Sequence, residues 1–368
     1  MLLEQLDTPA LIVDLDKMEA NLKKMQALAD ALGYALRPHT KAHKIPEFAR
    51  KQIELGAQGI CTAKLGEAEV MADGGQRDIL ITTPIAGQQK YERLVGLYQK
   101  YPDGRFIQVI DHVQQVQGIA RQAKAAGVTV SLLIEVESGQ QRCGVEAGPE
   151  LLSLIEAINR TESVSYEGIQ AYSGHLQHVK GFAARKSQAY DAVKNVFEYI
   201  VAELEPRGLA PKVVSGGGTG TFRAYAGLGY TEIQSGSYLF MDASYVAIGN
   251  AEGDSVNDEF QSALKVISTV ISHPKSDRAV LDAGMKALSI DSGMPVIDCH
   301  PDVIYQSGGD EHGILHLPKG NEPFYIGQKL TLTPSHCDTT LNNFSRLYGV
   351  REGVVVDSWE IMGRGRSD

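Results

Sequence analysis

A lysine at the end of a short strand-like run is the first residue whose surroundings suggest covalent chemistry. The stretch RPHTKAHK occupies residues 37–44, and Lys41 lies in it beside Arg37, His39 and His43. Nearby positive charge lowers the pKa of a lysine, and a deprotonated lysine can form an imine with an aldehyde. We therefore expect Lys41 to be an activated nucleophile. A solvated basic surface would have the same composition. The position of Lys41 in the fold therefore has to distinguish a nucleophile from an ordinary surface lysine.

A glycine-rich segment further along the chain has the composition of a phosphate-binding loop. SGGGTGT at 215–221 contains four glycines and three hydroxyl side chains, and GSY at 236–238 adds a second Gly–Ser pair. Glycines let backbone N–H groups converge on an anion, and hydroxyls are further donors. A flexible loop without a ligand is the alternative. The residues that we assign to the phosphate site are Ser215, Gly217, Gly218, Thr219, Gly236, Ser237 and Tyr238.

Both segments follow strands in a regular alternation of strand-like and helical stretches. Most gaps between the strand-like runs hold an amphipathic helix, which implies parallel strands. Eight such units over about 200 residues predict a closed (β/α)8 barrel. A doubly wound sheet is the alternative, but no GxGxxG follows the first strand. The eight runs lie at 36–41, 59–63, 78–83, 105–111, 131–136, 166–173, 212–218 and 232–238.

A barrel of this kind would bring the lysine and the glycines to one end. Barrel enzymes place their chemistry at the C-terminal ends of the strands, and a phosphate site after strands seven and eight recurs among them. The two glycine segments follow strands seven and eight, and Lys41 ends the first strand. A phosphate site and a nucleophilic lysine at one barrel mouth predict pyridoxal 5′-phosphate (PLP) as cofactor.

Beyond about Asp242 strand-like runs predominate and helical periods are scarce. We therefore predict a PLP-binding barrel over residues 16–243 and a mostly antiparallel β domain over residues 244–368, which the N-terminal strand within residues 1–15 joins. The strand-like runs of this second domain lie at 263–269, 278–283, 313–317, 330–334 and 353–361.

A histidine and an aspartate near the C-terminus, His336 and Asp338, are separated by one residue. In a β-strand residues i and i+2 point the same way, so we expect both side chains on one face and Cys337 on the other, unless a bulge turns Cys337 inward. An imidazole and a carboxylate form half of a divalent-metal site, which water or substrate completes. The oxygen ligand favours Mn²⁺ or Mg²⁺, and Zn²⁺ remains compatible.

Composition excludes several classes of partner. The formal net charge is −10, which argues against nucleic-acid binding. The four cysteines have no CxxC spacing, so neither a disulfide framework nor a zinc knuckle is expected, and a reducing cytoplasm is the simplest location. No apolar run approaches the roughly 18 residues that span a bilayer. We expect a cytoplasmic protein that acts on a small molecule.

Taken together, these motifs resemble those of the D-threonine aldolase and D-serine dehydratase family of fold-type III PLP enzymes, distant relatives of alanine racemase. The resemblance implies a homodimer with PLP on Lys41, with Arg142 near the pyridine ring and with Tyr172 and Gln177 in a pocket that includes His39. The dehydratase branch typically has cysteine where Asp338 stands, so this chain is more similar to the aldolase branch. Further matching stretches are RCGV (142–145), AYSGHLQH (171–178), GSYLFMD (236–242), DAGMKALSID (282–291), DEHG (310–313) and PSHCD (334–338).

The resemblance implies cleavage of a D-3-hydroxy amino acid, of the D-threonine or 3-hydroxy-D-aspartate type, to glycine and an aldehyde. A metal on His336 and Asp338 would lower the pKa of the substrate's β-hydroxyl, and His178 or a metal-bound water would take its proton. Dehydration to a 2-oxo acid and ammonia is the alternative. Racemisation would need a second base and no metal, and single-domain barrels that only bind PLP lack a C-terminal β domain.

Overall fold

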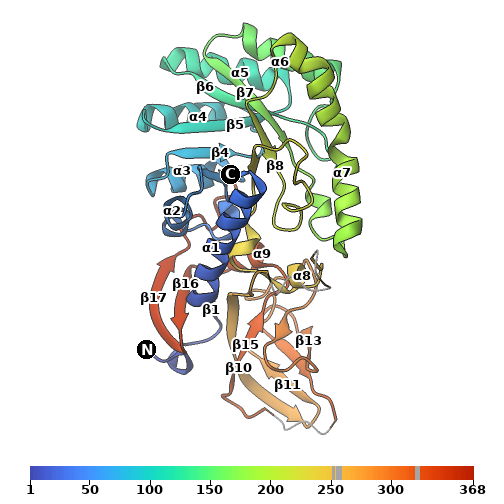
Figure 1. Ribbon diagram of the computed structural model, residues 1–368. Helices are drawn as coiled ribbons and strands as arrows, with labels where there is room; N and C mark the ends of the chain where they lie inside the picture. Colours follow the sequence, from blue (N-terminus) through green and yellow to red (C-terminus); the bar gives the residue numbers. More distant parts are fainter. Residues whose placement is uncertain (251–252, 254–258, 320–323) are drawn as a thin grey trace. The chain divides into compact units, whose positions relative to one another are not determined.

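The computed structural model describes residues 1–250, 253, 259–319 and 324–368. These divide into two compact units (Figure 1). The barrel unit comprises Met25–Gly236 with Arg366–Asp368, and the β unit comprises Met1–Lys24 with Ser237–Gly365. The boundary at residue 237 assigns Ser237 and Tyr238 to the β unit, whereas the sequence placed both in the barrel. Over the described ranges no helix is both long and apolar enough to cross a membrane.

The barrel unit contains eight parallel strands at the eight predicted places, although the first and last cover only two residues each and Lys41 follows the first strand instead of ending it. They are hydrogen-bonded in the order β2-β9-β8-β7-β6-β5-β4-β3. The two ends of this sheet meet after β2, where His39 forms a parallel bridge with Cys61 and Cys61 N–H donates to the Pro38 carbonyl at 2.8 Å. The strands are β2 (Ala35–Leu36), β3 (Ile60–Thr62), β4 (Asp78–Ile81), β5 (Arg105–Ile110), β6 (Val130–Glu135), β7 (Val164–Ala171), β8 (Val213–Gly216) and β9 (Glu232–Ile233).

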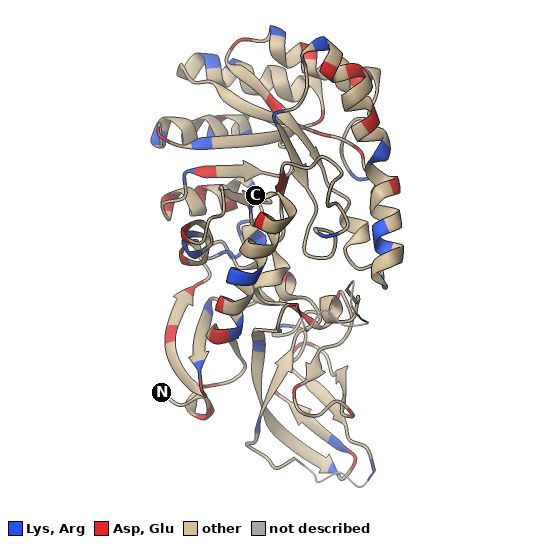
Figure 2. Cartoon of the chain, in the orientation of Figure 1, with Lys and Arg blue, Asp and Glu red and all other residues tan. Residues whose placement is uncertain are grey.

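Helices follow most of these strands, and most of the helices bury one face. In α5 the buried residues Val116, Ile119, Ala120 and Ala123 recur at helical spacing, and most of the other positions carry polar side chains. Figure 2 shows basic and acidic side chains interspersed along the helices of this unit, in line with the absence of a basic stripe from the sequence. The helices are α1 (Leu15–Leu32), α2 (Pro46–Glu54), α3 (Leu65–Asp73), α4 (Gln88–Lys100), α5 (Val113–Ala126), α6 (Pro149–Arg160) and α7 (Phe182–Tyr199).

The β unit is a mostly antiparallel sheet, as predicted. Its order is β13-β14-β11-β10-β1-β16-β17, and β15 pairs with β10 and β12. The N-terminal strand joins this sheet: β1 pairs antiparallel with β10 and parallel with β16. Its strands are β1 (Ala10–Asp14), β10 (Leu264–Lys275), β11 (Arg278–Leu281), β12 (Val296–Ile297), β13 (Ile304–Ser307), β14 (Gly313–His316), β15 (Lys329–Thr333), β16 (Arg346–Arg351) and β17 (Val354–Glu360).

Candidate active site

Lys41 lies in a 3-10 helix, η2 (Thr40–Ala42), which follows β2. The chain before it continues to pair with the segment after β9, because His39 N–H donates to the Ser235 carbonyl at 3.1 Å. Gly236 makes this close approach possible: a Cβ there would lie 2.8 Å from the His39 carbonyl oxygen. Gly236 therefore contributes space for the Lys41 turn.

A cavity at the C-terminal ends of the barrel strands brings four of the predicted site residues together. His39, Lys41, Arg142 and Tyr172 all line it. The sequence did not single out the other lining residues, which are Ala63, Thr82, Thr83, Gln170 and Gln234. An amine, a guanidinium and a phenol around one cavity are a suitable donor set for an aldehyde cofactor with a pyridine ring.

His39 is held in one tautomer by its neighbours. Its Nδ1 accepts the backbone N–H of Lys41 at 3.4 Å, so the ring proton lies on Nε2, 3.2 Å from Thr82 Oγ1. Burial, followed by the electrostatic effect of Lys41 and then of His43 and Arg142, lowers the pKa of His39 well below its ordinary value. His39 is therefore neutral at physiological pH.

The neighbours that the sequence analysis expected to activate Lys41 are not arranged to do so. Arg37 is fully buried and bonds to Glu232 at 2.9 Å and Asp78 at 2.6 Å. Burial lowers the pKa of His43 to about 4, and His39 is also neutral. The expectation was wrong because Arg37 is paired with two carboxylates and burial keeps both histidines uncharged. Of the cations discussed, Arg142 is the one that lines the cavity with Lys41.

Arg142 and Tyr172 form one wall of the cavity. The guanidinium carbon lies 5.5 Å from the centre of the Tyr172 ring, and Nη2 lies 4.0 Å from Glu135 Oε1. The Arg142 side chain is half exposed, whereas Glu135 is buried. Arg142 thus keeps its charge at the solvent side of the cavity, above a buried carboxyl group.

A chain of buried polar side chains connects Glu135 to the glycine-rich strand. Gln170 Nε2 donates to Glu135 Oε2, and Gln234 Nε2 lies 2.9 Å from Gln170 Oε1 and 2.8 Å from Ser215 Oγ. Ser215 is fully buried in β8 and is connected to the cavity through Gln234. Burial raises the pKa of Glu135 to about 8, so this acid is largely neutral near pH 7.

Replacing Glu135 by glutamine is expected to flatten the pH dependence of stability. Glu135 keeps its proton up to about pH 8 in the folded protein, but loses it near its ordinary value in the unfolded chain. The wild type therefore loses stability as pH rises from about 5 to 8, by roughly a few kcal/mol, and the variant does not. Urea unfolding at pH 5 and pH 8 measures this difference, with Glu156→Gln, at a half-exposed position on the surface of α6, as control. Parallel curves for wild type and Glu135→Gln would contradict it.

The glycine loop after β8 has fewer outward donors than its sequence suggested. Gly217 has a φ of +67°, which favours glycine. The N–H of Gly218 donates to Thr221 Oγ1 at 3.1 Å and is therefore bound within the loop. Gly218 leaves space for the Gln177 side chain, while Gly217 and Thr219 remain predicted phosphate contacts. Ser237 and Tyr238, in the 3-10 helix η6 (Ser237–Leu239), are buried.

The two residues predicted after β7 have different positions. Gln177 is 2% exposed, and its carboxamide bonds to Gly220 and Thr221 of the glycine loop instead of lining the cavity. His178, the next residue, is exposed. The sequence motif identified both positions, but only the fold shows that Gln177 is buried against the glycine loop and that His178 is exposed.

The predicted metal pair lies at the start of a helix, not in a strand. His336 is the N-cap of α9 (Cys337–Leu341), and Asp338 lies in its first turn. The expectation of a shared strand face was therefore wrong, and Cys337, the first residue of the helix, is buried. Burial alone would lower the pKa of His336, but the carboxylates of Asp338, Asp291 and Asp242 together raise it. Three carboxylates thus act on one imidazole.

Two aspartates to which no role was assigned from the sequence hold this helix start in position. Asp291 Oδ2 lies 2.7 Å from His336 Nδ1, and its Oδ1 accepts the hydroxyls of Ser289 at 2.6 Å and Thr339 at 3.0 Å. Asp242 Oδ2 accepts the backbone N–H of Cys337 at 3.0 Å. The DAGMKALSID and GSYLFMD motifs were the signals for these residues.

The arrangement suits an imidazole that binds metal through Nε2. Burial would raise the pKa of Asp291, but its hydrogen bonds and the nearby His336 hold it at about 2, so it is a carboxylate that accepts the Nδ1 proton. Such carboxylate–histidine pairs fix the tautomer of metal ligands. Among the described residues no group of three or more His, Cys, Asp or Glu side chains is arranged to hold a metal. The donor set fits a two-residue site that solvent or substrate completes.

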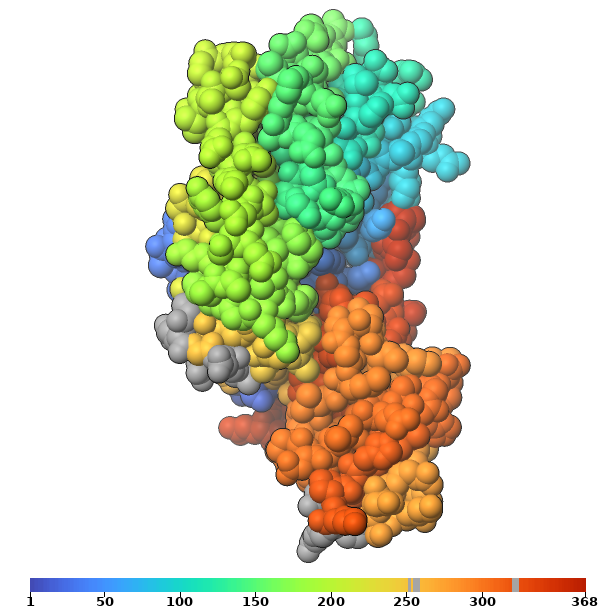
Figure 3. Space-filling model, turned by 90° about the vertical axis from the view of Figure 1, so that its right-hand side faces the viewer, coloured from blue at the N-terminus to red at the C-terminus, as the bar shows by residue number. Residues whose placement is uncertain are grey.

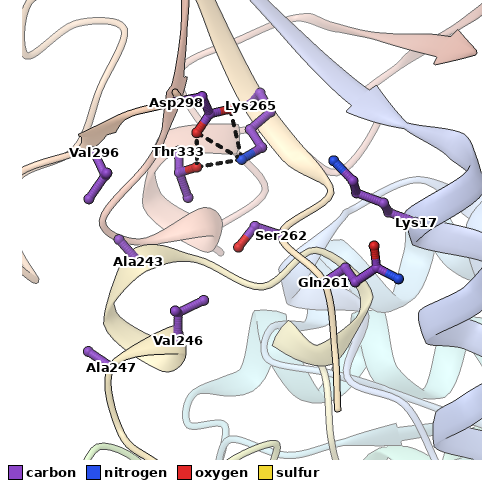
Figure 4. Close-up of a pocket in the computed structure, with 10 residues that line it drawn as sticks. All are labelled: Lys17, Ala243, Val246, Ala247, Gln261, Ser262, Lys265, Val296, Asp298 and Thr333. Atoms are coloured by element: carbon purple, nitrogen blue, oxygen red, sulfur yellow. Dashed lines mark hydrogen bonds and ion pairs between the residues drawn. The ribbon is translucent and has the colours of Figure 1, made fainter. Parts of the chain in front are cut away.

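The β unit also contains a cavity of about 690 Å³, shown in Figure 4. Lys265 Nζ lies there within 3.0 Å of both oxygens of Asp298, and it also donates to Thr333 Oγ1. Lys17, at the edge of the cavity, bonds to Asp14 at 3.0 Å. Each lysine is thus paired with an aspartate, and the group carries no excess charge for an ionic ligand.

Comparison with known proteins matches both units to known families. Residues 13–244 match the family described as alanine racemase, N-terminal domain, and residues 263–350 match the putative serine dehydratase domain. The chain is 38% identical to 3-hydroxy-D-aspartate aldolase of Paracoccus denitrificans (strain Pd 1222), covering 98% of this chain and 93% of that one. It is 39% identical to D-threonine aldolase of Arthrobacter sp, covering 99% and 94%.

Solved structures and more distant relatives agree with this match. The crystal structure of D-threonine aldolase from Filomicrobium marinum superposes with a TM-score of 0.94 at 38% identity, covering 100% of this chain and 99% of that chain. D-threo-3-hydroxyaspartate dehydratase of Delftia sp. (strain HT23) is 31% identical, covering 96% and 97%. The aldolases are thus more similar to this chain than the dehydratase is.

Proposed function

Because this chain belongs to the family that joins an alanine racemase N-terminal domain to a serine dehydratase domain, we propose that it is an aldolase that depends on PLP and a divalent metal. Its substrate would be a D-3-hydroxy amino acid of the D-threonine or 3-hydroxy-D-aspartate type, and its products glycine and an aldehyde. The observation that carries the proposal is the cavity at the end of the barrel strands, where Lys41 lies beside Arg142 and Tyr172.

The residues around this cavity fit PLP. Lys41 would hold the cofactor covalently, and Arg142 and Tyr172 would contact its ring, while Gly217, Thr219 and Ser215 would lie toward its phosphate. When bound, PLP supplies an electron sink for the carbanion left at Cα. His39 is neutral, and its Nδ1 bond to the Lys41 N–H orients the turn that carries the nucleophile. Tyr172 and Arg142 would orient the substrate at the open side.

His336 and Asp338 would hold Mn²⁺ or Mg²⁺, with Zn²⁺ as a weaker fit to a site with one oxygen ligand. A bound ion supplies Lewis acidity to the substrate's β-hydroxyl. Asp291 keeps the proton of His336 on Nδ1 and so leaves Nε2 available. We propose the exposed imidazole of His178 as the group that takes the hydroxyl proton. We further propose that the enzyme works as a homodimer in the cytoplasm.

Two features favour aldol cleavage over dehydration. The aldolases are 38% and 39% identical, and the dehydratase 31%. The carboxylate of Asp338 also occupies the position where the dehydratase branch typically has a cysteine. A carboxylate–imidazole pair suits a harder ion that acidifies a hydroxyl, which is the requirement of cleavage between Cα and Cβ.

A product assay tests this proposal. The enzyme is incubated with D-threonine or with 3-hydroxy-D-aspartate, with and without chelator, and glycine, aldehyde, ammonia and 2-oxo acid are measured. We expect glycine and an equal amount of aldehyde, lost with chelator and restored by Mn²⁺ or Mg²⁺. Formation of ammonia and a 2-oxo acid would reassign the chain to the dehydratases. Epimerised substrate whose formation chelator leaves intact would make it a racemase.

A further inference from the structure

Two buried side chains from the segment between β7 and α7 contact the glycine loop from behind. Gln177 follows the 3-10 helix η3 (Gly174–Leu176), and Arg185 lies near the start of α7. Each is 2% exposed. α7 itself runs along the surface of the barrel unit (Figure 3), so Arg185 is an inward-facing cation on a surface helix. A buried arginine is unusual enough to need an explanation.

Gln177 bonds to the loop through both ends of its carboxamide. Its Oε1 accepts the N–H of Gly220 at 3.0 Å, and its Nε2 donates to Thr221 Oγ1 at 2.9 Å. Thr221 Oγ1 in turn accepts the N–H of Gly218 at 3.1 Å. One side chain therefore fixes three residues of the loop, two of them directly and Gly218 through the threonine hydroxyl.

The glycines of the loop are shaped to Gln177. A Cβ at Gly218 would lie 2.6 Å from Gln177 Oε1, and a Cβ at Gly220 would lie 2.1 Å from the Gln177 carbonyl oxygen. Any other residue at these two positions would displace the loop or Gln177. Gly218 and Gly220, which lie in the segment that the sequence suggested as a phosphate-binding loop, are therefore also required for close contact with Gln177.

Arg185 holds a carbonyl group of the loop. Its Nε donates to the Gly220 carbonyl at 2.6 Å, and its Nη1 donates to the Val179 carbonyl at 2.7 Å. The bond directs the carbonyl oxygen of Gly220, the negative end of its peptide dipole, toward the guanidinium. The oxygen therefore does not repel an anion bound at the loop. A charged donor is also stronger than a neutral one, and the buried charge acts over a short distance through protein of low polarity.

We propose that Gln177 and Arg185 are the positioning residues of the phosphate site: they hold residues 217–221 in the shape that binds the PLP phosphate, and Arg185 adds positive charge behind it. This inference rests on the proposed binding of PLP at the loop. It also corrects the role expected for Gln177, from substrate pocket to support of the cofactor's phosphate. Neither side chain is expected to touch the reacting atoms.

The test compares PLP with pyridoxal, which has the same aldehyde and ring but no phosphate. The cofactor is removed from the full-length enzyme, and each compound is titrated back while its absorbance on binding is followed. Variants are Arg185→Met, Arg185→Lys and the isosteric Gln177→Glu, whose carboxylate can still accept the Gly220 N–H but cannot donate to Thr221 Oγ1 and brings negative charge. Lys186→Met, which removes an exposed cation from the same helical turn, is the matched control.

We expect Arg185→Met to weaken PLP binding by about 10- to 100-fold, with pyridoxal affinity changed less than about threefold. Arg185→Lys retains the positive charge but not the two-pronged guanidinium, so its PLP affinity should fall less than that of Arg185→Met. Gln177→Glu should also weaken PLP selectively, and Lys186→Met should match the wild type. If Arg185→Met does not fold, as judged by circular dichroism, the ratio of PLP affinity to pyridoxal affinity in Arg185→Lys and Gln177→Glu still tests the inference.

Equal losses for PLP and pyridoxal in these variants would overturn the inference, because they would indicate a general structural role. Unchanged PLP affinity would overturn it as well. A wild type that binds PLP no better than pyridoxal is a different result: it would remove the phosphate site from the proposed function before any variant is compared.

Discussion

Replacing Lys41 by alanine is expected to lower kcat by at least about 10³-fold and to remove the covalent link between enzyme and cofactor. Lys41 is the amine that lines the cavity with Arg142 and Tyr172. Without it no protein group in the cavity can form the imine. Borohydride reduction of the wild type, followed by digestion and mass spectrometry, should yield a pyridoxyl group on the peptide that contains Lys41.

Two comparisons make this experiment specific for the amine. Lys41→Arg retains the positive charge, but a guanidinium does not form the imine, so it should be as inactive as Lys41→Ala. A small added amine such as methylamine should partly restore turnover to Lys41→Ala and not to Lys41→Arg. A pyridoxyl group on Lys44, whose ammonium is paired with Glu67 at 3.0 Å, or full activity of Lys41→Ala would contradict the assignment.

Replacing His336 or Asp338 by alanine is expected to lower kcat for aldol cleavage by about 10²- to 10⁴-fold, because a bound ion contributes several kcal/mol to a developing alkoxide. Both residues lie at the start of α9, where Asp242 fixes the backbone. Titration of the metal-free variants with Mn²⁺, followed by electron paramagnetic resonance, should give no saturable tight site. PLP absorbance should be unchanged, which separates this loss from a loss of cofactor.

Asp291→Asn and Asp338→Cys are informative companions to these alanine variants. The neutral amide introduced by Asp291→Asn would not hold the Nδ1 proton of His336 as a carboxylate does. We expect a 10- to 100-fold weaker Mn²⁺ affinity, roughly the usual effect of losing such a partner. Asp338→Cys should shift preference from Mn²⁺ toward Zn²⁺, since thiolates favour softer ions. Tight Mn²⁺ binding and normal turnover in His336→Ala would show that the ion is held elsewhere.

Much of the fold could be predicted because its signals are local. Most barrel strands are short apolar runs, and most of the helices between them have their apolar residues at helical spacing, as in α5. The N-terminal strand was recognised as surplus to the barrel, and β1 indeed pairs with β10 and β16. Strands β12, β13 and β16 were missed. β12 has only two residues and β13 only four, and Gly349 interrupts the apolar pattern of β16, so each gives little periodic signal.

Predictions that depended on side-chain direction were less successful. His336 and Asp338 were found as a pair, but their segment caps a helix and does not form a strand. Arg37 and His43 flank Lys41 in sequence, yet Arg37 is neutralised by Glu232 and Asp78, and burial keeps His43 uncharged. Ion pairs and burial depend on distant segments of chain, which spacing along one segment does not reveal.

The sequence by itself determined the order of strands and helices, the lysine and glycine segments at strand ends, and the imidazole–carboxylate pair, because all of these follow from residue type and short-range spacing. Tertiary structure decided which of those residues share a cavity and which support it. Gln177 and Arg185 bind the glycine loop, and Asp291 binds His336. These hydrogen bonds join residues that are 35 to 45 positions apart in the chain. Such contacts form only when the chain folds back on itself, so no local pattern specifies them.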